Sequence, residues 1–237
     1  MNLGLIGSPV EKSISPQLQR ILFKEFGLND YIYKKYEVIN DNLSSFFDRF
    51  KSGDFNGINI TIPHKEAALE FLDTLDKSAE ILGNINCVKR TENMLTGYNT
   101  DLYGFNMLLK QNNVNIESTH CLVLGAGGSA KTIIKALIDG GARSITIKNK
   151  SMDNAQAIQS YAQRLGDTDI YLCTESDAKF DIAIKATPLG MYEKEDTQDF
   201  FDISVDKNTV LIDLIYTSHH TLFLDKHKDN VKQVING

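Results

Sequence analysis

Short apolar runs alternate with helical patterns along the whole chain, in two successive sets. The strand-like runs of the first set are 3–6, 31–38 and 58–62. Those of the second set are 120–124, 144–148, 170–173, 181–186 and 210–216. Between them, apolar residues recur every three or four positions, which is typical of helices packed on a sheet. This βαβα order predicts layered α/β architecture with parallel sheets.

The first predicted helix follows residue 15. Ser15 and Pro16 fit the N-cap and first position of a helix that runs to residue 26. Its apolar stripe is expected to be core. The stripe consists of Leu18, Ile21, Leu22 and Phe26.

Further elements place a domain boundary near residue 101. A helix is expected over 63–72, another over 79–82 with Gly83 as its terminating glycine, and a hairpin over 87–98. A helix beginning near residue 101 then leads into the second set of strands. We therefore expect domains at 1–101 and 102–237, each α/β.

Composition narrows the class of protein. The 237 residues carry 25 basic and 31 acidic side chains, a net charge of −6, with a sequence pI near 5.4. This balance argues against nucleic acid or an anionic membrane as a partner. No apolar run approaches the length of a membrane span, and the first residues lack the pattern of a signal peptide. A cytoplasmic protein is expected.

Cysteine and histidine spacing indicates neither a disulfide framework nor a metal site. The three cysteines are Cys87, Cys121 and Cys173, with no CxxC pair, and Cys121 lies in an apolar run where a buried free thiol is expected. The five histidines show no HExxH or other paired ligand spacing. We expect no metal.

A glycine-rich turn after the strand at 120–124 has the GxGxxA form of a dinucleotide-binding fingerprint. Gly125 permits the tight turn, Gly127 lets the backbone approach a pyrophosphate, and the small Ala130 allows close packing of helix and strand. A glycine turn that binds nothing is the alternative. The strand–turn–helix context favours the dinucleotide site.

The end of the next strand bears on cofactor choice. An acidic residue there binds the ribose hydroxyls of NAD, whereas a basic residue accommodates the 2′-phosphate of NADP. The sequence has Lys148 and Lys150 and no acid before Asp153, which favours NADP. Alternatively, both lysines are simply solvated.

A polar strand in the first half carries a second chemical signal. Asn59 and Thr61 share one face of the run that ends at Pro63, and Lys65 follows at the strand end. Ligands of open α/β sheets bind at such ends. A polar ligand is therefore expected here, although a merely structural edge strand would explain these residues about equally well.

Taken together, eight segments in order make the chain resemble the shikimate dehydrogenase family over its whole length. They are Gly7–Pro9 with Ser13–Pro16, Asn59–Lys65, Gly83–Asn86, Gly97–Asp101, Gly125–Ala130, Asn149–Ser151, Ala186–Met191 and Asp213–Tyr216. The resemblance implies an NADP-dependent oxidoreductase that interconverts shikimate and 3-dehydroshikimate in aromatic amino acid and chorismate biosynthesis. It also implies an N-terminal α/β substrate domain and a Rossmann-like, doubly wound NADP-binding domain.

The resemblance also assigns roles to residues of this chain. Lys65 and Asp101 would be the catalytic acid–base pair. The substrate residues would be Ser13, Ser15, Thr61, Asn86 and Tyr216. The cofactor residues would be Gly125, Ala126, Gly127, Gly128, Ser129, Asn149, Lys150, Ser151, Thr187, Leu214 and Gly237. Which of Lys65 and Asp101 carries the transferred proton stays open, as does the choice between monomer and homodimer.

The chain departs from the family pattern at several positions. Lys12, Gln19 and Arg20 stand where the family usually has histidine and a His-Asn pair, which could disturb the rim of the substrate site. The usual Asn-Arg-Thr reads Asn149–Ser151 with lysine and serine, and the usual Asn-Ala-Thr opens with Lys185. Both changes keep a polar or basic site but could alter cofactor affinity.

The family pattern also continues beyond residue 237, through a helix whose methionine and glutamine return to the substrate domain. A truncated chain or a naturally short form would explain this, and both put full activity in doubt. The missing helix supports one alternative, a catalytically weak nucleotide- or ligand-binding homologue. The nearest enzyme alternative is a quinate/shikimate dehydrogenase of broader specificity, against which the lack of an acid before Asp153 argues mildly. An unspecified Rossmann-like protein would leave the polar strand at 59–65 unexplained.

Overall fold

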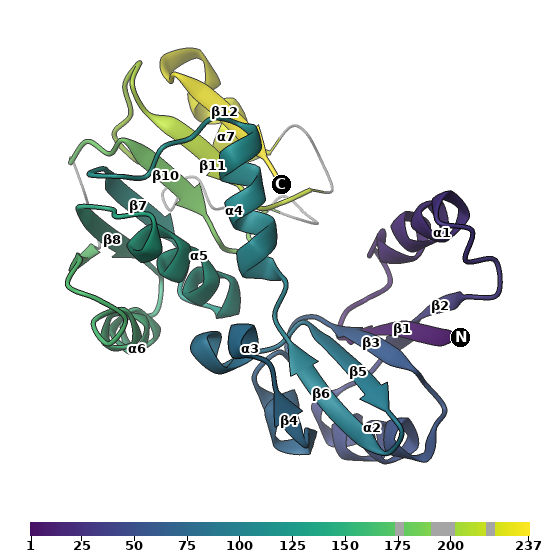
Figure 1. Ribbon diagram of the computed structural model, residues 1–237. Helices are drawn as coiled ribbons and strands as arrows, with labels where there is room; N and C mark the ends of the chain where they lie inside the picture. The colour runs from purple at the N-terminus through teal and green to yellow at the C-terminus, as the bar shows by residue number, and fades with distance from the viewer. Residues whose placement is uncertain (174–177, 191–201, 217–220) are drawn as a thin grey trace. The chain divides into compact units, whose positions relative to one another are not determined.

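Two compact units, Met1–Thr100 and Asp101–Gly237, make up the chain in the computed structural model (Figure 1). The described residues are 1–173, 178–190, 202–216 and 221–237. Each unit has its own sheet and its own hydrophobic core. No helix in these described ranges combines the length and the apolar character needed to cross a bilayer.

A six-stranded mixed sheet organises the first unit, in the order β2-β1-β3-β5-β6-β4. The strands are β1 (Asn2–Gly7), β2 (Ile32–Glu37), β3 (Gly57–Ile60), β4 (Thr74–Leu75), β5 (Cys87–Thr91) and β6 (Met94–Tyr98). Strand β1 pairs in parallel with β2 and β3, whereas β3, β5 and β6 pair antiparallel. The carboxyl ends of β1, β2 and β3 therefore meet at one edge of the sheet.

Phenylalanines of α2 contribute to the core of the first unit. Its helices are α1 (Ser15–Glu25), the 3₁₀ helix η1 (Asn40–Asn42), α2 (Leu43–Ser52), the 3₁₀ helix η2 (Ala67–Phe71) and α3 (Lys77–Leu82). Phe47 and Phe50 of α2 are buried, and the Phe47 ring stacks on Phe71 with centroids 4.8 Å apart. Stacked aromatic pairs of this kind tie α2 to η2.

The α1 prediction was right about the helix and wrong about its burial. No residue of α1 is buried: Leu18 is 51% exposed and Ile21 67%, and Phe26, which directly follows the helix, is 70% exposed. Periodicity identifies an apolar side but does not say whether anything covers it. The helix also begins one position earlier than predicted, because Ile14 is the N-cap and Ser15 the first helical residue.

Two short elements of this unit also differ from the predictions. The helix expected over 63–72 is the five-residue 3₁₀ helix η2, and the two-residue strand β4 was not predicted. The helix ending at Gly83 is confirmed, with Gly83 in the left-handed region at φ +61°. Strand β4 is too short for its sequence to show an alternating pattern.

The second unit has a fully parallel sheet in the order β12-β11-β10-β7-β8-β9. The strands are β7 (His120–Leu124), β8 (Ser144–Lys148), β9 (Asp169–Cys173), β10 (Ile182–Lys185), β11 (Val210–Asp213) and β12 (Gln233–Asn236). The chain moves outward from β7 to β9, then returns to the other side of β7 with β10. This reversal between β7 and β10 is where doubly wound sheets bind ligands.

Helices cover both faces of that sheet (Figure 1). They are α4 (Asp101–Gln111), α5 (Gly128–Asp139), α6 (Met152–Ala162), α7 (Leu222–His227) and the 3₁₀ helix η4 (Lys228–Asn230). Residues of α4, α5 and α6 pack on one face, and Phe223 and Leu224 of α7 pack on the other. The predicted α/β, Rossmann-like fold class is confirmed, whereas α7, η4 and β12 were not predicted.

Candidate active site

The segment that follows β3 is held by backbone bonds to the β1 end. The Thr61 amide donates to the Ile6 carbonyl at 2.9 Å, and the Ser8 amide donates to the Ile62 carbonyl at 2.9 Å. A Cβ at Gly7 would lie 2.7 Å from the Ile62 carbonyl oxygen, so only glycine permits this approach. Thr61 is thereby fixed at the carboxyl edge of β1 and β3.

His64 anchors the backbone immediately before Lys65. The ring is completely buried, and its Nε2 lies 2.6 Å from the Val38 carbonyl oxygen. Since a carbonyl only accepts, Nε2 is the donor in this hydrogen bond. The Nδ1 atom of the ring has no hydrogen-bond partner within the described part of the chain. The carbonyl of Lys65 accepts from the Ile85 amide at 2.8 Å, which joins this loop to the next.

Asn86 links two further loops of the first unit. Its Nδ2 donates to the Thr100 hydroxyl at 2.9 Å, and its Oδ1 accepts from the Thr100 amide at 3.0 Å. Asp101 follows directly as the first residue of α4. The hydrogen bonds therefore bring the loops of Thr61–Lys65, Asn86 and Thr100 together.

Asn59 does not offer a free polar side chain, contrary to the expectation for this strand. Its Oδ1 accepts from the Tyr33 hydroxyl at 2.8 Å, and its Nδ2 donates to the Asn86 carbonyl at 3.2 Å. The amide thus joins β3 to its neighbours. Alternation placed Asn59 on the same face as Thr61, but it could not reveal these internal partners.

Ser13 and Ser15 lie together at the start of α1. Their hydroxyl oxygens are 3.1 Å apart, and the Ser15 amide donates to the Ser13 hydroxyl at 3.2 Å. The loop before them is held by Glu37, which accepts from the Ser8 hydroxyl at 2.6 Å and the Val10 amide at 3.0 Å. These two donors lower the pKa of Glu37. Sequence reasoning missed Glu37, which no motif marks.

In the second unit, the glycines of the turn after β7 have two different roles: Gly125 packs closely on a neighbouring loop, whereas Gly127 and Gly128 border open space. Gly125 has φ +119°, and a Cβ there would lie 3.1 Å from the carbonyl carbon and oxygen of Ala186. Around Gly127 and Gly128, by contrast, an added Cβ would meet no described atom within 4 Å.

Gly127 is the N-cap of α5, with no side chain to bind the amides of the first turn. Such amides bind phosphate oxygens. Ala130 is completely buried, as the fingerprint requires. The residues present therefore fit the pyrophosphate of a dinucleotide.

The two lysines after β8 have different environments. Lys148 is buried, and its Nζ donates to the Asp202 carbonyl at 3.1 Å, so the alternative of a solvated side chain is wrong for it. Lys150 is exposed. The Ser151 hydroxyl caps α6 by accepting from the Asn154 amide at 3.3 Å. Lys150 is thus the basic side chain that solvent can reach at this strand end.

Three more cofactor candidates lie on the loops that follow β10, β11 and β12. The Thr187 hydroxyl accepts from the Leu189 amide at 3.4 Å. The Gly237 amide donates to the Asp213 carbonyl at 2.8 Å, and a Cβ at Gly237 would lie 2.8 Å from the Leu214 carbonyl oxygen.

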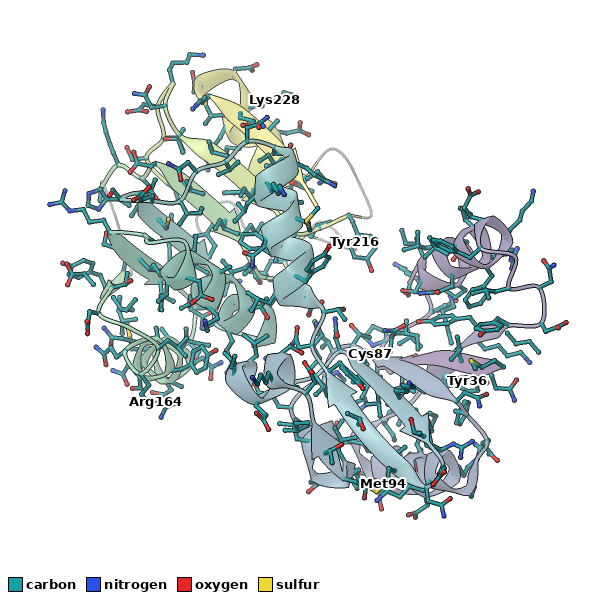
Figure 2. The ribbon with its side chains drawn as sticks, in the orientation of Figure 1. Tyr36, Cys87, Met94, Arg164, Tyr216 and Lys228 are labelled. Carbon is teal, nitrogen blue, oxygen red and sulfur yellow. The ribbon has the colours of Figure 1, made fainter. Side chains whose placement is uncertain are left out.

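Tyr216, labelled in Figure 2, is 44% exposed beyond β11. Met191, part of the Ala186–Met191 motif, lies outside the described residues.

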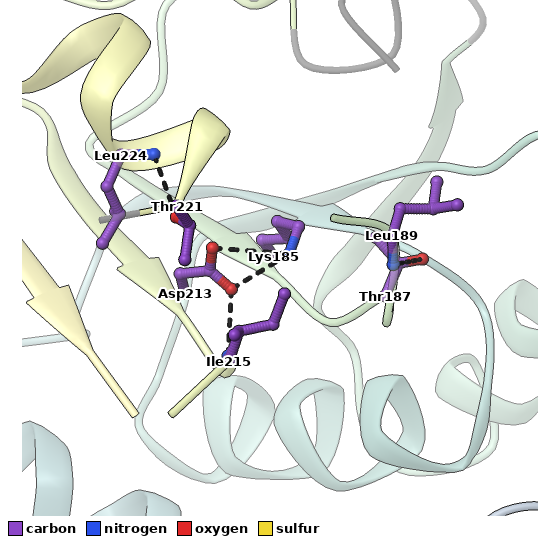
Figure 3. A network of polar contacts seen from close by, with 7 residues as sticks. All are labelled: Lys185, Thr187, Leu189, Asp213, Ile215, Thr221 and Leu224. Carbon is purple, nitrogen blue, oxygen red and sulfur yellow. Dashed lines mark hydrogen bonds and ion pairs between the residues drawn. The ribbon is translucent and has the colours of Figure 1, made fainter. Parts of the chain in front are cut away.

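Lys185 does not present a free basic group, contrary to expectation. Its side chain is 1% exposed and that of Asp213 is fully buried, with Nζ 3.2 and 3.3 Å from the two carboxylate oxygens (Figure 3). Burial lowers the pKa of Lys185, while the neighbouring Asp213 opposes that change. The sequence did contain a signal for this ion pair, because one apolar strand ends in a lysine and the next ends in an aspartate.

Known proteins match both units. The pattern of the shikimate dehydrogenase substrate binding domain matches residues 5–88, and that of shikimate/quinate 5-dehydrogenase matches residues 107–215. An NADP⁺ shikimate dehydrogenase of Clostridium beijerinckii is 35% identical over 99% of this chain and 85% of its own length.

Solved structures agree with these matches. A shikimate dehydrogenase of Thermus thermophilus, in complex with NADP(H) and shikimate, is 26% identical with a TM-score of 0.82 over 98% of this chain and 86% of its own. A 5-ketofructose reductase of Gluconobacter is 28% identical with a TM-score of 0.82 over 99% and 86%. The two matched patterns and the C. beijerinckii relative establish that the chain belongs to the shikimate dehydrogenase family.

Proposed function

We propose that this protein oxidises shikimate to 3-dehydroshikimate with NADP⁺, and catalyses the reverse reduction with NADPH. The observation that carries the proposal is the bonded assembly of Thr61–Lys65, Ile85–Asn86 and Thr100 at one edge of the first sheet. It brings together the segments that carry a hydroxyl, an amide and a lysine, groups of the kind that pair with the oxygens of a polyol acid. The family match over the full chain supports the same substrate.

The chemistry assigns distinct tasks to the chain's own groups. Oxidation removes a hydride from the carbon that bears the reacting hydroxyl, and the hydroxyl proton must leave to a base. We assign that proton transfer to the pair Lys65 and Asp101. Ser13, Ser15, Thr61, Asn86 and Tyr216 bind the remaining hydroxyls and the carboxylate. Bound NADP supplies the hydride acceptor or donor, the nicotinamide ring.

The cofactor proposal uses the second unit. The amides at the start of α5 hold the pyrophosphate, with Gly127 and Gly128 leaving room for it. Lys150 binds the 2′-phosphate beside Asn149 and Ser151. Thr187, Leu214 and Gly237 border the nicotinamide half. The protein would act on small molecules in the cytoplasm, as a monomer or a homodimer.

Steady-state kinetics of Lys65→Met test the catalytic assignment. NADPH formation from shikimate should fall by about 10² to 10⁴ in kcat, because a positioned acid–base group contributes rates of that order. Lys89→Met, an exposed lysine on β5, is the matched control and should turn over normally. A wild-type protein that binds NADPH but turns over no shikimate would overturn the proposal.

The similarity to 5-ketofructose reductase favours a second candidate, the reduction of a different polyhydroxylated ketone. The same hydroxyl-rich site suits either substrate. Comparing kcat/KM for shikimate, quinate and 5-ketofructose separates the candidates. A value at least tenfold higher for shikimate than for the other two supports the first, and the opposite order supports the second.

A further inference from the structure

A buried ion pair closes the carboxyl ends of β10 and β11. Lys185 and Asp213 are the last residues of these adjacent parallel strands and are paired in register. Figure 3 shows the ammonium directed at the carboxylate, with Thr187 and Thr221 on nearby segments. Both side chains are essentially inaccessible to water, so each charge is compensated mainly within the protein.

The same two residues organise the loops beyond the strands. The Leu214 amide donates to the Lys185 carbonyl at 3.2 Å, and the Ile215 amide donates to Asp213 Oδ1 at 3.0 Å. The Asp213 carbonyl in turn accepts from Gly237. The segments after β10, β11 and β12 therefore depend on one pair of residues.

Sheet order places this pair under one half of a bound dinucleotide. The pyrophosphate site lies at the β7 end, and the adenosine half extends toward β8, where Lys150 follows. Strands β10 and β11 lie on the other side of β7. The nicotinamide half of a bound dinucleotide would therefore extend toward the ends of β10 and β11, where Lys185 and Asp213 are the last strand residues.

A charge near the nicotinamide ring would affect the binding of NADP⁺ and NADPH differently. The nicotinamide ring is a cation in NADP⁺ and neutral in NADPH, whereas the two forms share the same adenosine half. We propose that Lys185 and Asp213 are positioning residues that form a charge-balanced support for the nicotinamide half of the site. They fix the loops at 186–187 and 214–215, and because their two charges compensate each other, the pair favours neither redox form of the cofactor. This inference rests on the proposed function.

Two isosteric variants test the charge balance. D213N removes the carboxylate that faces the Lys185 ammonium and should raise the ratio of the NADP⁺ to the NADPH dissociation constant. K185Q leaves an uncompensated carboxylate and should lower that ratio. For separations of roughly 8 to 15 Å and an effective dielectric constant of about 20, each shift should be about 5- to 30-fold. The double variant K185Q/D213N should return the ratio to the wild-type value.

The measurement is equilibrium binding of NADP⁺ and of NADPH without shikimate. D213N is measured at about pH 6.5, because burial lowers the pKa of Lys185, and K185Q is measured at about pH 8.5. The wild type is measured at both pH values. Circular dichroism verifies folding, and K185N replaces K185Q if the latter does not fold. K148M is the matched control: it removes another buried strand-end lysine, on the adenosine side, and should leave the ratio unchanged.

The outcomes separate the two proposals. Opposite shifts in the single variants, cancelled in the double variant, support the charge-balanced support. Equal weakening of both cofactors with an unmoved ratio would show a purely structural pair and overturn it. A wild type that binds neither NADP⁺ nor NADPH would instead overturn the proposed cofactor.

Discussion

The glycine turn after β7 allows packing and ligand binding to be tested separately. Gly125→Ala places a side chain at φ +119°, a conformation that costs about 1 to 3 kcal/mol outside glycine. The new Cβ also meets the Ala186 backbone at 3.1 Å, for which we add about 1 kcal/mol. The free energy of unfolding should therefore fall by about 2 to 4 kcal/mol, lowering Tm by about 5 to 15 °C.

Gly127→Ala, two residues away, should behave in the opposite manner. Gly127 has φ −99°, which alanine adopts freely, and no described atom lies within 4 Å of the added Cβ. Stability should stay unchanged or rise by up to about 1 kcal/mol. A pyrophosphate held against this backbone would nevertheless collide with the methyl group. NADPH affinity should fall at least about tenfold, equivalent to about 1.4 kcal/mol.

Thermal unfolding followed by circular dichroism and NADPH titration followed by fluorescence measure the two effects on the same samples. If Gly127→Ala bound NADPH as tightly as the wild type, the pyrophosphate would not approach this glycine. If Gly125→Ala were as stable as the wild type, the close contact with Ala186 would not constrain the turn. Either result would refute the corresponding step of the reasoning.

Three further predictions concern single groups of the described chain. His64→Leu should lower the free energy of unfolding by about 1 to 3 kcal/mol, since the Val38 carbonyl loses its buried donor, and His64→Gln should recover part of it in urea unfolding. Ionised Glu37 stabilises the folded state above its ordinary pKa of 4.5, and this contribution is lost as pH falls through the lowered folded-state pKa. Glu37→Gln should therefore be less stable than the wild type at about pH 6, with the difference shrinking toward about pH 3; a constant difference would contradict this. Burial raises the pKa of Cys121 to about 12, so mass spectrometry should find it unalkylated until urea unfolds the second unit.

Sequence reasoning succeeded where a feature follows from local pattern. The βαβα order, the turn at Gly125 and the glycine end of α3 are set by periodicity and by backbone conformations that only glycine adopts readily. The hydroxyls of Ser13 and Ser15 lie together in the structure, and their role in binding the substrate stays a prediction.

The failures concern what lies across space from a residue. The α1 stripe was expected in the core because helical spacing cannot tell whether another element covers that side. Lys185 was interpreted alone, although its environment is decided by Asp213, which is 28 positions away in the chain but adjacent in the sheet. For Asn59 the sequence left a ligand role and a structural role about equally open, because its partner Tyr33 lies on a different strand and no local pattern reveals that bond.

The exposed state of α1 has a consequence for the thermodynamics of recognition. Because α1 has no buried side chain, its unfolding disrupts no core packing. Its backbone amides should therefore exchange with solvent at a free-energy cost far below that of global unfolding. Ser15 begins this helix and is bonded to Ser13. A ligand bound by both hydroxyls would first select the wound form of α1. Its apparent affinity would then be scaled by the fraction of molecules in which that first turn is formed.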